Sequence, residues 1–174
     1  MAKKDKKSKK ASKAGKSEKW VYFFGVKGGA EGVGVSKEIL GGKGLGLAEM
    51  VKIGLPVPAG FTVTINACDQ YYKGGKKFPS GMEEQVLANV KKLGDAHDPL
   101  LVSVRSGAAR SMPGMMETIL NLGLNDVSVE GLAARTKNAR FAYDSYRRFL
   151  QMYSTTAMGL SKDPLEEMLH GMKE

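Results

Sequence analysis

The distribution of lysine divides this chain into two parts of different character. Residues 1–19 contain nine lysines against only Asp5 and Glu18, so this segment carries +7 of the net charge of +9. It has no aromatic residue and almost no apolar one. Such a composition cannot bury enough apolar surface to offset the entropy lost on ordering, so we expect a disordered tail. Residues 20–174 remain to build one packed domain.

Two roles fit the basic tail. It is either a solubilising, self-repelling arm or a weak contact for RNA or another polyanion, made by neutralising phosphates. It has neither the apolar run of a secretory signal nor the arginines of a mitochondrial transit peptide. The single Cys68 excludes an internal disulfide framework and suits a reducing compartment. We therefore expect a cytoplasmic protein, and we expect no membrane-spanning helix because no stretch approaches roughly 18 continuous apolar residues.

Short apolar runs separated by glycine and proline predict the elements of residues 20–174. The predicted strands are residues 20–24, 61–65, 100–104 and 118–122. The predicted helices are residues 45–53, 66–72, 82–93, 128–136, 138–158 and 163–172. Strands and helices mix without a regular βαβ alternation, which favours an α+β fold.

Two polar residues stand where helix caps are expected. Asn66 is predicted to cap the helix that follows it, and Ser80 to cap the helix over residues 82–93. Cys68 is predicted to be a small buried apolar residue.

Two short segments have the composition of an anion site. In the first, Gly41, Gly42 and Gly44 surround Lys43 just before a predicted helix. Glycines let the backbone approach a ligand closely, and free N–H groups at a helix start beside a lysine attract phosphate. The alternative is a structural glycine turn with a solvated lysine, because the spacing matches neither a P-loop nor a complete dinucleotide fingerprint.

The second segment is Ser103 to Gly107, where Arg105 leaves a strand beside Ser106 and Gly107. An arginine fork at a strand end suits a phosphate. The alternative is an arginine paired with a local carboxylate. Arg110 either adds charge to this loop or is solvated.

Metal and nucleophile chemistry are not indicated. His97 lies in an acidic loop without a second His or a Cys at ligand spacing, and His170 is expected to be exposed. We predict no metal ligands and no complete set of catalytic residues. The methionines at 112, 115 and 116 either pack beneath their loop or line a wall against a base or partner.

The body of the chain resembles the pyruvate, phosphate dikinase family from about residue 20 to residue 160. The segments that carry the resemblance are WVYF (20–23), LGGKG (40–44), LAEM (47–50), PVPAGF (56–61), LLVSVRSGAARSMPGMMETILNLGLND (100–126) and FAYDSYRRFLQMY (141–153). The SMPGMM run sets it apart from the related phosphoenolpyruvate synthases. The lysine-rich tail is not part of the family pattern.

The resemblance implies the N-terminal part of an ATP-grasp nucleotide-binding domain over residues 20–174, with a mixed sheet flanked by helices. The implied reaction converts ATP, phosphate and pyruvate to AMP, diphosphate and phosphoenolpyruvate through a phosphohistidine, with Mg²⁺. Lys43 matches the family's ATP-phosphate-binding lysine and Arg105 its phosphate-contacting arginine. Gly42, Gly44, Ser106 and Gly107 are expected to contribute from the loops. The resemblance also implies a homodimer of the family type as an assembly.

The resemblance also implies what this chain lacks. The acidic Mg²⁺ ligands, the phosphohistidine domain and the pyruvate barrel of the family have no counterpart in its sequence. We therefore expect the chain alone to be inactive. The alternative is a non-catalytic binding module, or a truncated product, that docks on a partner chain. In either case we expect exposed apolar surface, and hence self-association or marginal stability.

Overall fold

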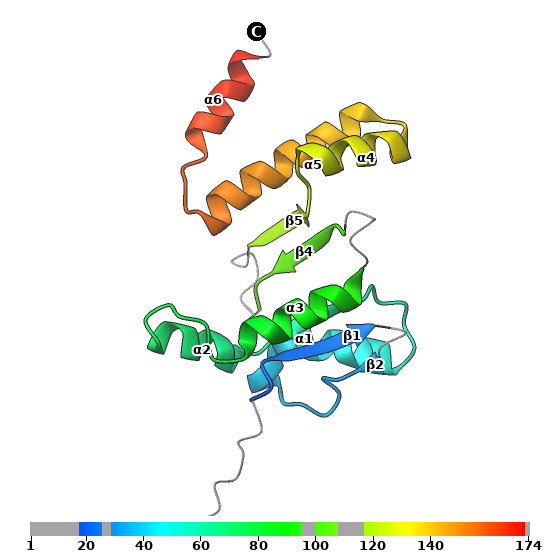
Figure 1. Cartoon of the computed structure of the whole chain (residues 1–174), viewed down its shortest axis with the longest axis vertical. Helices are drawn as coiled ribbons and strands as arrows, with labels where there is room; N and C mark the ends of the chain where they lie inside the picture. The colour runs from blue at the N-terminus through cyan, green and yellow to red at the C-terminus, as the bar shows by residue number, and fades with distance from the viewer. Residues whose placement is uncertain (1–17, 26–28, 95–99, 108–116, 173–174) are drawn as a thin grey trace, which may run out of the picture.

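The chain folds into two halves that follow each other in sequence (Figure 1). In the computed structural model the described residues are 18–25, 29–94, 100–107 and 117–172. The first half runs from strand β1 to helix α3, and the second from strand β4 to helix α6. The tail predicted to be disordered covers residues 1–19, of which residues 1–17 lie outside the described residues. Glu18 and Lys19 are described and bond to the first half, so the prediction does not hold for these two residues.

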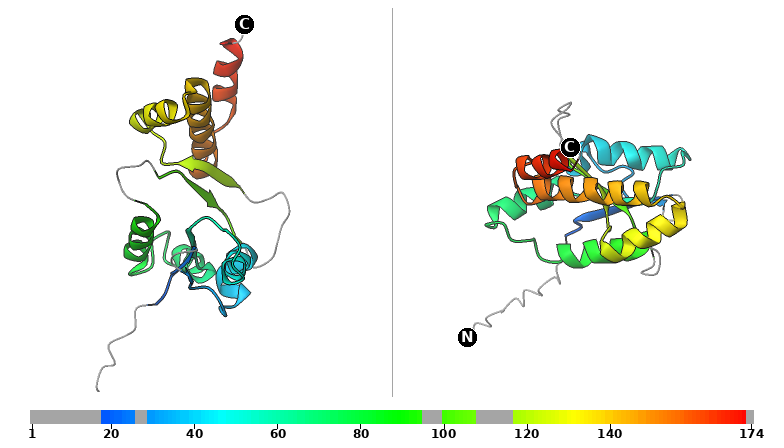
Figure 2. Two further views of the ribbon diagram at one scale, coloured as in Figure 1. Left: turned by 90° about the vertical axis from the view of Figure 1, so that its right-hand side faces the viewer. Right: turned by 90° about the horizontal axis from the view of Figure 1, so that it is seen from above.

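The first half is a small antiparallel sheet between two helices. Strand β1 (Val21–Gly25) lies between β2 (Gly29–Ala30) and β3 (Gly60–Val63). Helices α1 (Lys37–Lys52) and α3 (Met82–Leu93) lie on opposite sides of β1 (Figure 2), and α2 (Ile65–Lys73) follows β3 directly. The core cluster contains Trp20, Val21 and Ala67, with Phe61, Met82 and Val86 packed against it. Because the cluster joins β1, α2 and α3, these elements depend on one another.

The second half is a β-hairpin covered by helices. Strands β4 (Val102–Arg105) and β5 (Thr118–Leu122) pair antiparallel. Helix α4 (Asp126–Thr136) packs along α5 (Ala139–Met152), and α5 packs on β5. A π-helical turn, η1 (Tyr153–Ala157), and helix α6 (Asp163–Gly171) follow. The core residues of this half are Ile119, Leu124, Val129, Leu132, Ala142 and Phe149.

The predicted α+β class is confirmed, although the sheets differ from the mixed sheet that we expected. The described strands form two separate antiparallel sheets. The strand at residues 118–122 has the predicted bounds, and most other predicted elements lie within a few residues of theirs. Helix α1, however, begins at Lys37 and not at residue 45, and the short strand β2 was not predicted. Among the described residues no helix has both the length and the hydropathy needed to cross a membrane.

The predicted continuous helix over residues 138–158 is confirmed in its extent to within one residue, but it changes from α to π geometry after Met152. After that residue the chain enters the wider π turn. The hydroxyls of Ser154 and Thr155 both donate to the carbonyl of Gln151, at 3.1 and 2.8 Å. Hydroxyls that compete for a helix carbonyl in this way disturb the regular ladder, which explains why α5 ends here.

Both predicted caps are wrong, because each cap lies elsewhere in the chain. Thr64 caps α2, with its hydroxyl accepting from the N–H of Ala67 at 3.2 Å. Helix α3 starts after Gly81, whose φ of 76° suits glycine, and its start has no side-chain cap. The prediction that Cys68 is buried is also wrong. Cys68 is exposed, whereas its neighbour Ala67 is fully buried.

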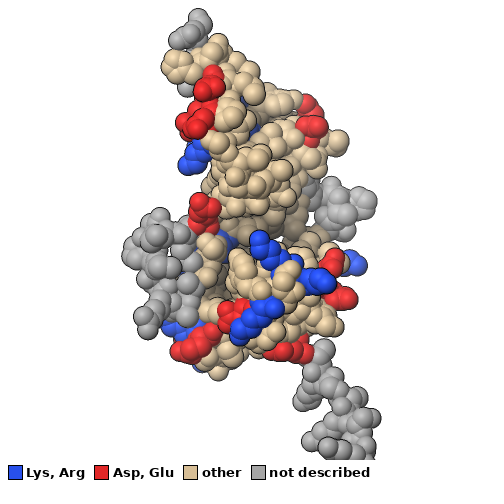
Figure 3. Space-filling model, turned by 90° about the vertical axis from the view of Figure 1, so that its left-hand side faces the viewer, with Lys and Arg blue, Asp and Glu red and all other residues tan. Residues whose placement is uncertain are grey.

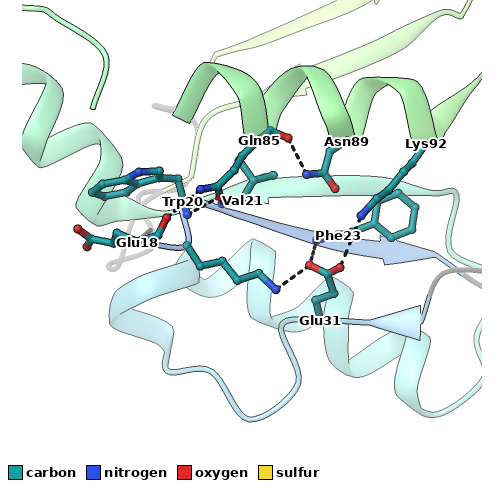
Figure 4. A network of polar contacts seen from close by, with 9 residues as sticks. Glu18, Trp20, Val21, Phe23, Glu31, Gln85, Asn89 and Lys92 are labelled. Carbon is teal, nitrogen blue, oxygen red and sulfur yellow. Dashed lines mark hydrogen bonds and ion pairs between the residues drawn. The ribbon is translucent and has the colours of Figure 1, made fainter. Parts of the chain in front are cut away.

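A polar network fixes the start of β1 against α3 and the loop after β2 (Figure 4). The side-chain amide oxygen of Gln85 accepts from the N–H groups of Trp20 and Val21 at 2.8 and 3.2 Å. Glu31 accepts from the N–H of Phe23 at 3.2 Å and forms an ion pair with Lys19 at 2.9 Å. The Gln85 amide thus supplies β1 with bonds that a neighbouring strand would otherwise supply.

The pKa of Glu31 lies below its ordinary value of 4.5. Burial acts to raise this pKa, but the hydrogen bonds from Lys19 and Phe23 and the charges of Lys19 and Lys92 together outweigh burial. The ionised carboxylate therefore stabilises the fold above about pH 4.5, and this contribution is lost as the pH falls through the lower, folded-state pKa.

We predict that Glu31→Gln lowers the free energy of unfolding at pH 7 by about 0.5–1 kcal/mol, because a partly exposed ion pair is lost. The difference in free energy of unfolding between the variant and the original chain should disappear as the pH falls below 4.5. Urea denaturation from pH 7 to pH 3 measures it. The control is Glu49→Gln on the exposed side of α1, which should change stability little; an equal gap at every pH would contradict the role given to the Glu31 carboxylate.

Candidate phosphate-binding site

Helix α1 is interrupted at Gly41, in the middle of the glycine-rich segment. Gly41 has φ 72° and ψ 167°, a conformation that suits glycine, and the helix resumes at Gly42. The chain therefore makes a new helix start at Gly42, Lys43 and Gly44. Backbone N–H groups in the first turn of a helix lack partners within it and attract anions. The predicted helix start was a few residues later, and the turn over residues 37–40 was not predicted.

The three residues after the interruption have different surroundings. Gly44 is buried on the side of α1 that faces the sheet. A Cβ atom at Gly44 would lie 2.7 Å from Cγ2 and 3.0 Å from Oγ1 of Thr62 on β3. Gly42 and Lys43 are exposed. Gly44 is thus required for packing, whereas Gly42 and Lys43 are free to meet a ligand.

The second predicted segment lies at the carboxyl end of β4. Arg105 pairs with Thr118 in the hairpin and its side chain is exposed. The hydroxyl and the N–H of Ser106 both donate to the carbonyl of Glu117, at 3.1 and 3.4 Å. Among the described residues no carboxylate forms an ion pair with Arg105. The exposed Gly107 ends this stretch, with open space where a Cβ would lie.

The fold brings these two segments together, although they are far apart in sequence. The ammonium Nζ of Lys43 donates to the main-chain carbonyl of Ser106 at 3.2 Å. Lys43 therefore reaches the residue that directly follows Arg105. The ammonium of Lys43, at the helix start, thus lies beside the backbone of the residue next to Arg105. Lysine, arginine and free helix N–H groups are the groups that bind phosphate.

Several predicted residues cannot be placed at this site. Arg110, His97 and the methionines at 112, 115 and 116 lie outside the described residues. His170 is exposed, as predicted. In the described part of the chain no group of three His, Cys, Asp or Glu side chains could hold a metal ion.

Sequence reasoning missed two residues of this region. Thr62 sets how closely α1 approaches the sheet, and Glu117 holds Ser106 through its main-chain carbonyl. No local signal marks either of them, because both act through strand register and not through the chemistry of a motif.

Comparison with known proteins finds similar sequences among the pyruvate, phosphate dikinases. A model of the pyruvate phosphate dikinase AMP/ATP-binding domain matches residues 37–76, which include Lys43. The chain is 54% identical to pyruvate, phosphate dikinase of Clostridium symbiosum over 164 residues, covering 90% of this chain and 18% of that protein. It is 52% identical over 167 residues to the enzyme of Giardia intestinalis, covering 90% and 19%. Over most of its length, the chain is thus similar to a segment of pyruvate, phosphate dikinases.

The match covers a small part of the dikinases. A third relative, the chloroplastic pyruvate, phosphate dikinase of Flaveria pringlei, is 51% identical over 165 residues, covering 90% of this chain and 17% of the relative. The chain thus spans less than a fifth of the relatives it matches. The part it resembles is the ATP-binding portion at the N-terminus.

We predict that Gly44→Ala destabilises the chain by about 1–3 kcal/mol, because the added methyl group overpacks the contact with Thr62. Thr62→Ala removes both crowding atoms, so the double variant should recover much of the loss. The control is Gly46→Ala, whose Cβ would meet no atom within 4 Å; it should raise stability by about 0.5–1 kcal/mol through helix propensity. Thermal unfolding measures all four, and an equal effect of Gly44→Ala and Gly46→Ala would refute the close approach.

Proposed function

We propose that Lys43 and Arg105 bind the phosphates of ATP, with backbone N–H groups of the turn at Gly42 and Gly44. The hydrogen bond from Lys43 to Ser106 is the observation that supports this best, since it brings the two predicted segments into one region. The match to an AMP/ATP-binding domain over residues 37–76 supports it independently. Ser106 and Gly107 shape the strand end beside Arg105.

The reaction that we propose for a complete enzyme of this kind is that of its family. ATP, phosphate and pyruvate give AMP, diphosphate and phosphoenolpyruvate through a phosphohistidine, with Mg²⁺. The contribution of this chain is electrostatic. Lys43 and Arg105 would neutralise the charge that develops on the transferred group, and the helix start would orient its oxygens.

We further propose that the chain alone does not turn over. This proposal is supported by the length of the match, since the chain spans only 18% of the Clostridium symbiosum enzyme. ATP binding needs only the phosphate contacts described above and is expected without turnover. The cytoplasmic location, the family-type homodimer and the contact of the basic tail with polyanions stay predictions.

We predict that Lys43→Met and Arg105→Met each weaken binding of ATP and diphosphate about 10- to 100-fold, because each removes a charged hydrogen-bond donor. Isothermal titration calorimetry measures binding. The matched control is Lys52→Met, which removes an exposed lysine from the last turn of the same helix and should bind as the original chain does. Equal losses in all three variants would indicate a general charge effect, and formation of ATP from AMP, diphosphate and phosphoenolpyruvate by the pure chain would disprove its inactivity.

A second candidate function is a binding module that docks on a complementary chain of a dikinase. The observation that favours it is apolar surface on η1, α6 and the segment between them. No residue of α6 is buried, and Met168 and Met172 are 60% and 79% exposed. Met158 and Leu160 are exposed as well. Figure 3 shows the second half from the side of η1, where uncharged side chains cover a broad area.

We predict that this surface makes the pure chain self-associate as its concentration rises, because apolar patches of this kind mark interaction sites. Sedimentation velocity should show a larger species, and Met168→Ser with Met172→Ser should weaken it several-fold. The control is Val127→Ser on α4, which is 83% exposed but lies away from α6. A monodisperse monomer at every concentration would count against the docking role.

A further inference from the structure

Lys43 joins two halves that are otherwise built separately. The core of the first half consists of Trp20, Val21 and Ala67 with their neighbours, and the core of the second half shares no residue with it. The pairs of helices and strands with extensive contacts also fall within one half or the other. The Lys43–Ser106 hydrogen bond, in contrast, connects the start of the resumed α1 helix to the end of β4.

The position of this bond matters for Arg105. Arg105 belongs to β4 and therefore to the second half, whereas Lys43 belongs to the first. Residues that bind one ligand from two loosely connected bodies must be held near each other before the ligand arrives, or binding carries the cost of ordering them. The Ser106 carbonyl is adjacent to Arg105 in the chain, so a bond to it restrains the position of Arg105 directly.

The bond is compatible with a phosphate ligand. An ammonium group has three donors, and the Ser106 carbonyl occupies one of them. Lys43 is exposed, so its other donors are accessible. The same ammonium can hold the carbonyl and contact an anion, and the two interactions need not exclude each other.

We propose that Lys43 is also a positioning residue, which fastens the end of β4 to the start of the resumed α1 helix and so holds Arg105 beside the glycine-rich turn before any ligand binds. This deepens the phosphate-binding role proposed above and rests on it for the ligand. The restraint itself exists in the ligand-free chain and is measured there.

The chain offers a direct way to measure the restraint. Its single cysteine, Cys68, is exposed on α2 in the first half, and Ala134→Cys would add a second label site on the exposed side of α4 in the second half. Spin labels at these positions report the distribution of distances between the halves by double electron–electron resonance. The measurement is made without ligand on the full chain and on its Lys43→Met, Lys43→Arg and Lys52→Met variants, with folding checked by circular dichroism.

We expect Lys43→Met to broaden the distribution and to raise the ratio of separated to docked molecules about five-fold, which corresponds to about 1 kcal/mol. Lys43→Arg keeps a charged donor and should restore the narrow distribution, and Lys52→Met should leave it unchanged. A distribution that is the same in Lys43→Met as in the original chain would overturn the proposal, as would equal broadening in Lys52→Met.

Adding diphosphate separates this proposal from the proposed function. If Lys43 and Arg105 share the anion, diphosphate should narrow the distribution in the original chain and have little effect in Lys43→Met. Broadening by Lys43→Met in the absence of ligand, with no response to diphosphate in any variant, would support the positioning role and reject the phosphate site. A response to diphosphate without any effect of Lys43→Met in its absence would support the phosphate site and reject the positioning role.

Discussion

The close approach of α1 to β3 is the constraint on which the first half and its site depend. Gly44 faces Thr62 with no room for a side chain between them. This contact fixes how α1 lies on the sheet, and the interruption at Gly41 fixes where the helix resumes. The direction in which Lys43 leaves the helix follows from these two facts. The glycines of this segment therefore serve packing and local conformation first, and the exposed turn beside Lys43 is the result.

The two halves bury the apolar residues of their strands in different ways. The first half encloses its sheet between α1 and α3, and the Gln85 amide and Glu31 complete the hydrogen bonding of β1. In the second half the helices bury Ile119 of β5, but they leave its cross-strand partner Val104 on the same face exposed. Val104 and Leu120 remain exposed on β4 and β5. The candidate site lies where the enclosed first half meets the more exposed second half. A ligand-binding region needs both a well-packed support and accessible surface, and this position offers both.

Sequence patterns were informative where the cause of structure is local. The apolar run at residues 118–122 predicted β5, and the glycines around Lys43 predicted a helix start with free N–H groups. Thr64 and Asn66 are both good caps, and only the end of β3 decides that Thr64 is used. Ala67 and Cys68 are neighbours on α2, and only the exact rotation of the helix decides that Ala67 is buried and Cys68 exposed. The amino-acid composition does not determine that rotation.

The contact between Lys43 and Ser106 could not be predicted from local sequence patterns, because it depends on how two separately packed halves meet. The family resemblance indicated that both segments serve one ligand, but it did not reveal the contact between them. The role of Thr62 could not be predicted for a similar reason, since it comes from the register of β3 against β1 and from the position of α1.

The hydrogen bonds at the start of β1 determine when this strand becomes fixed in the fold during synthesis. Trp20 donates its backbone N–H to Gln85 and its indole N–H to the carbonyl of Ser80, across 65 and 60 residues. Pairings between residues so distant form late, because the intervening chain must first be present and be brought together. On the ribosome, β1 is translated first in this domain but cannot obtain its bonds to α3 until that helix has emerged. The strand that begins the domain is thus among the last parts of the first half to be secured.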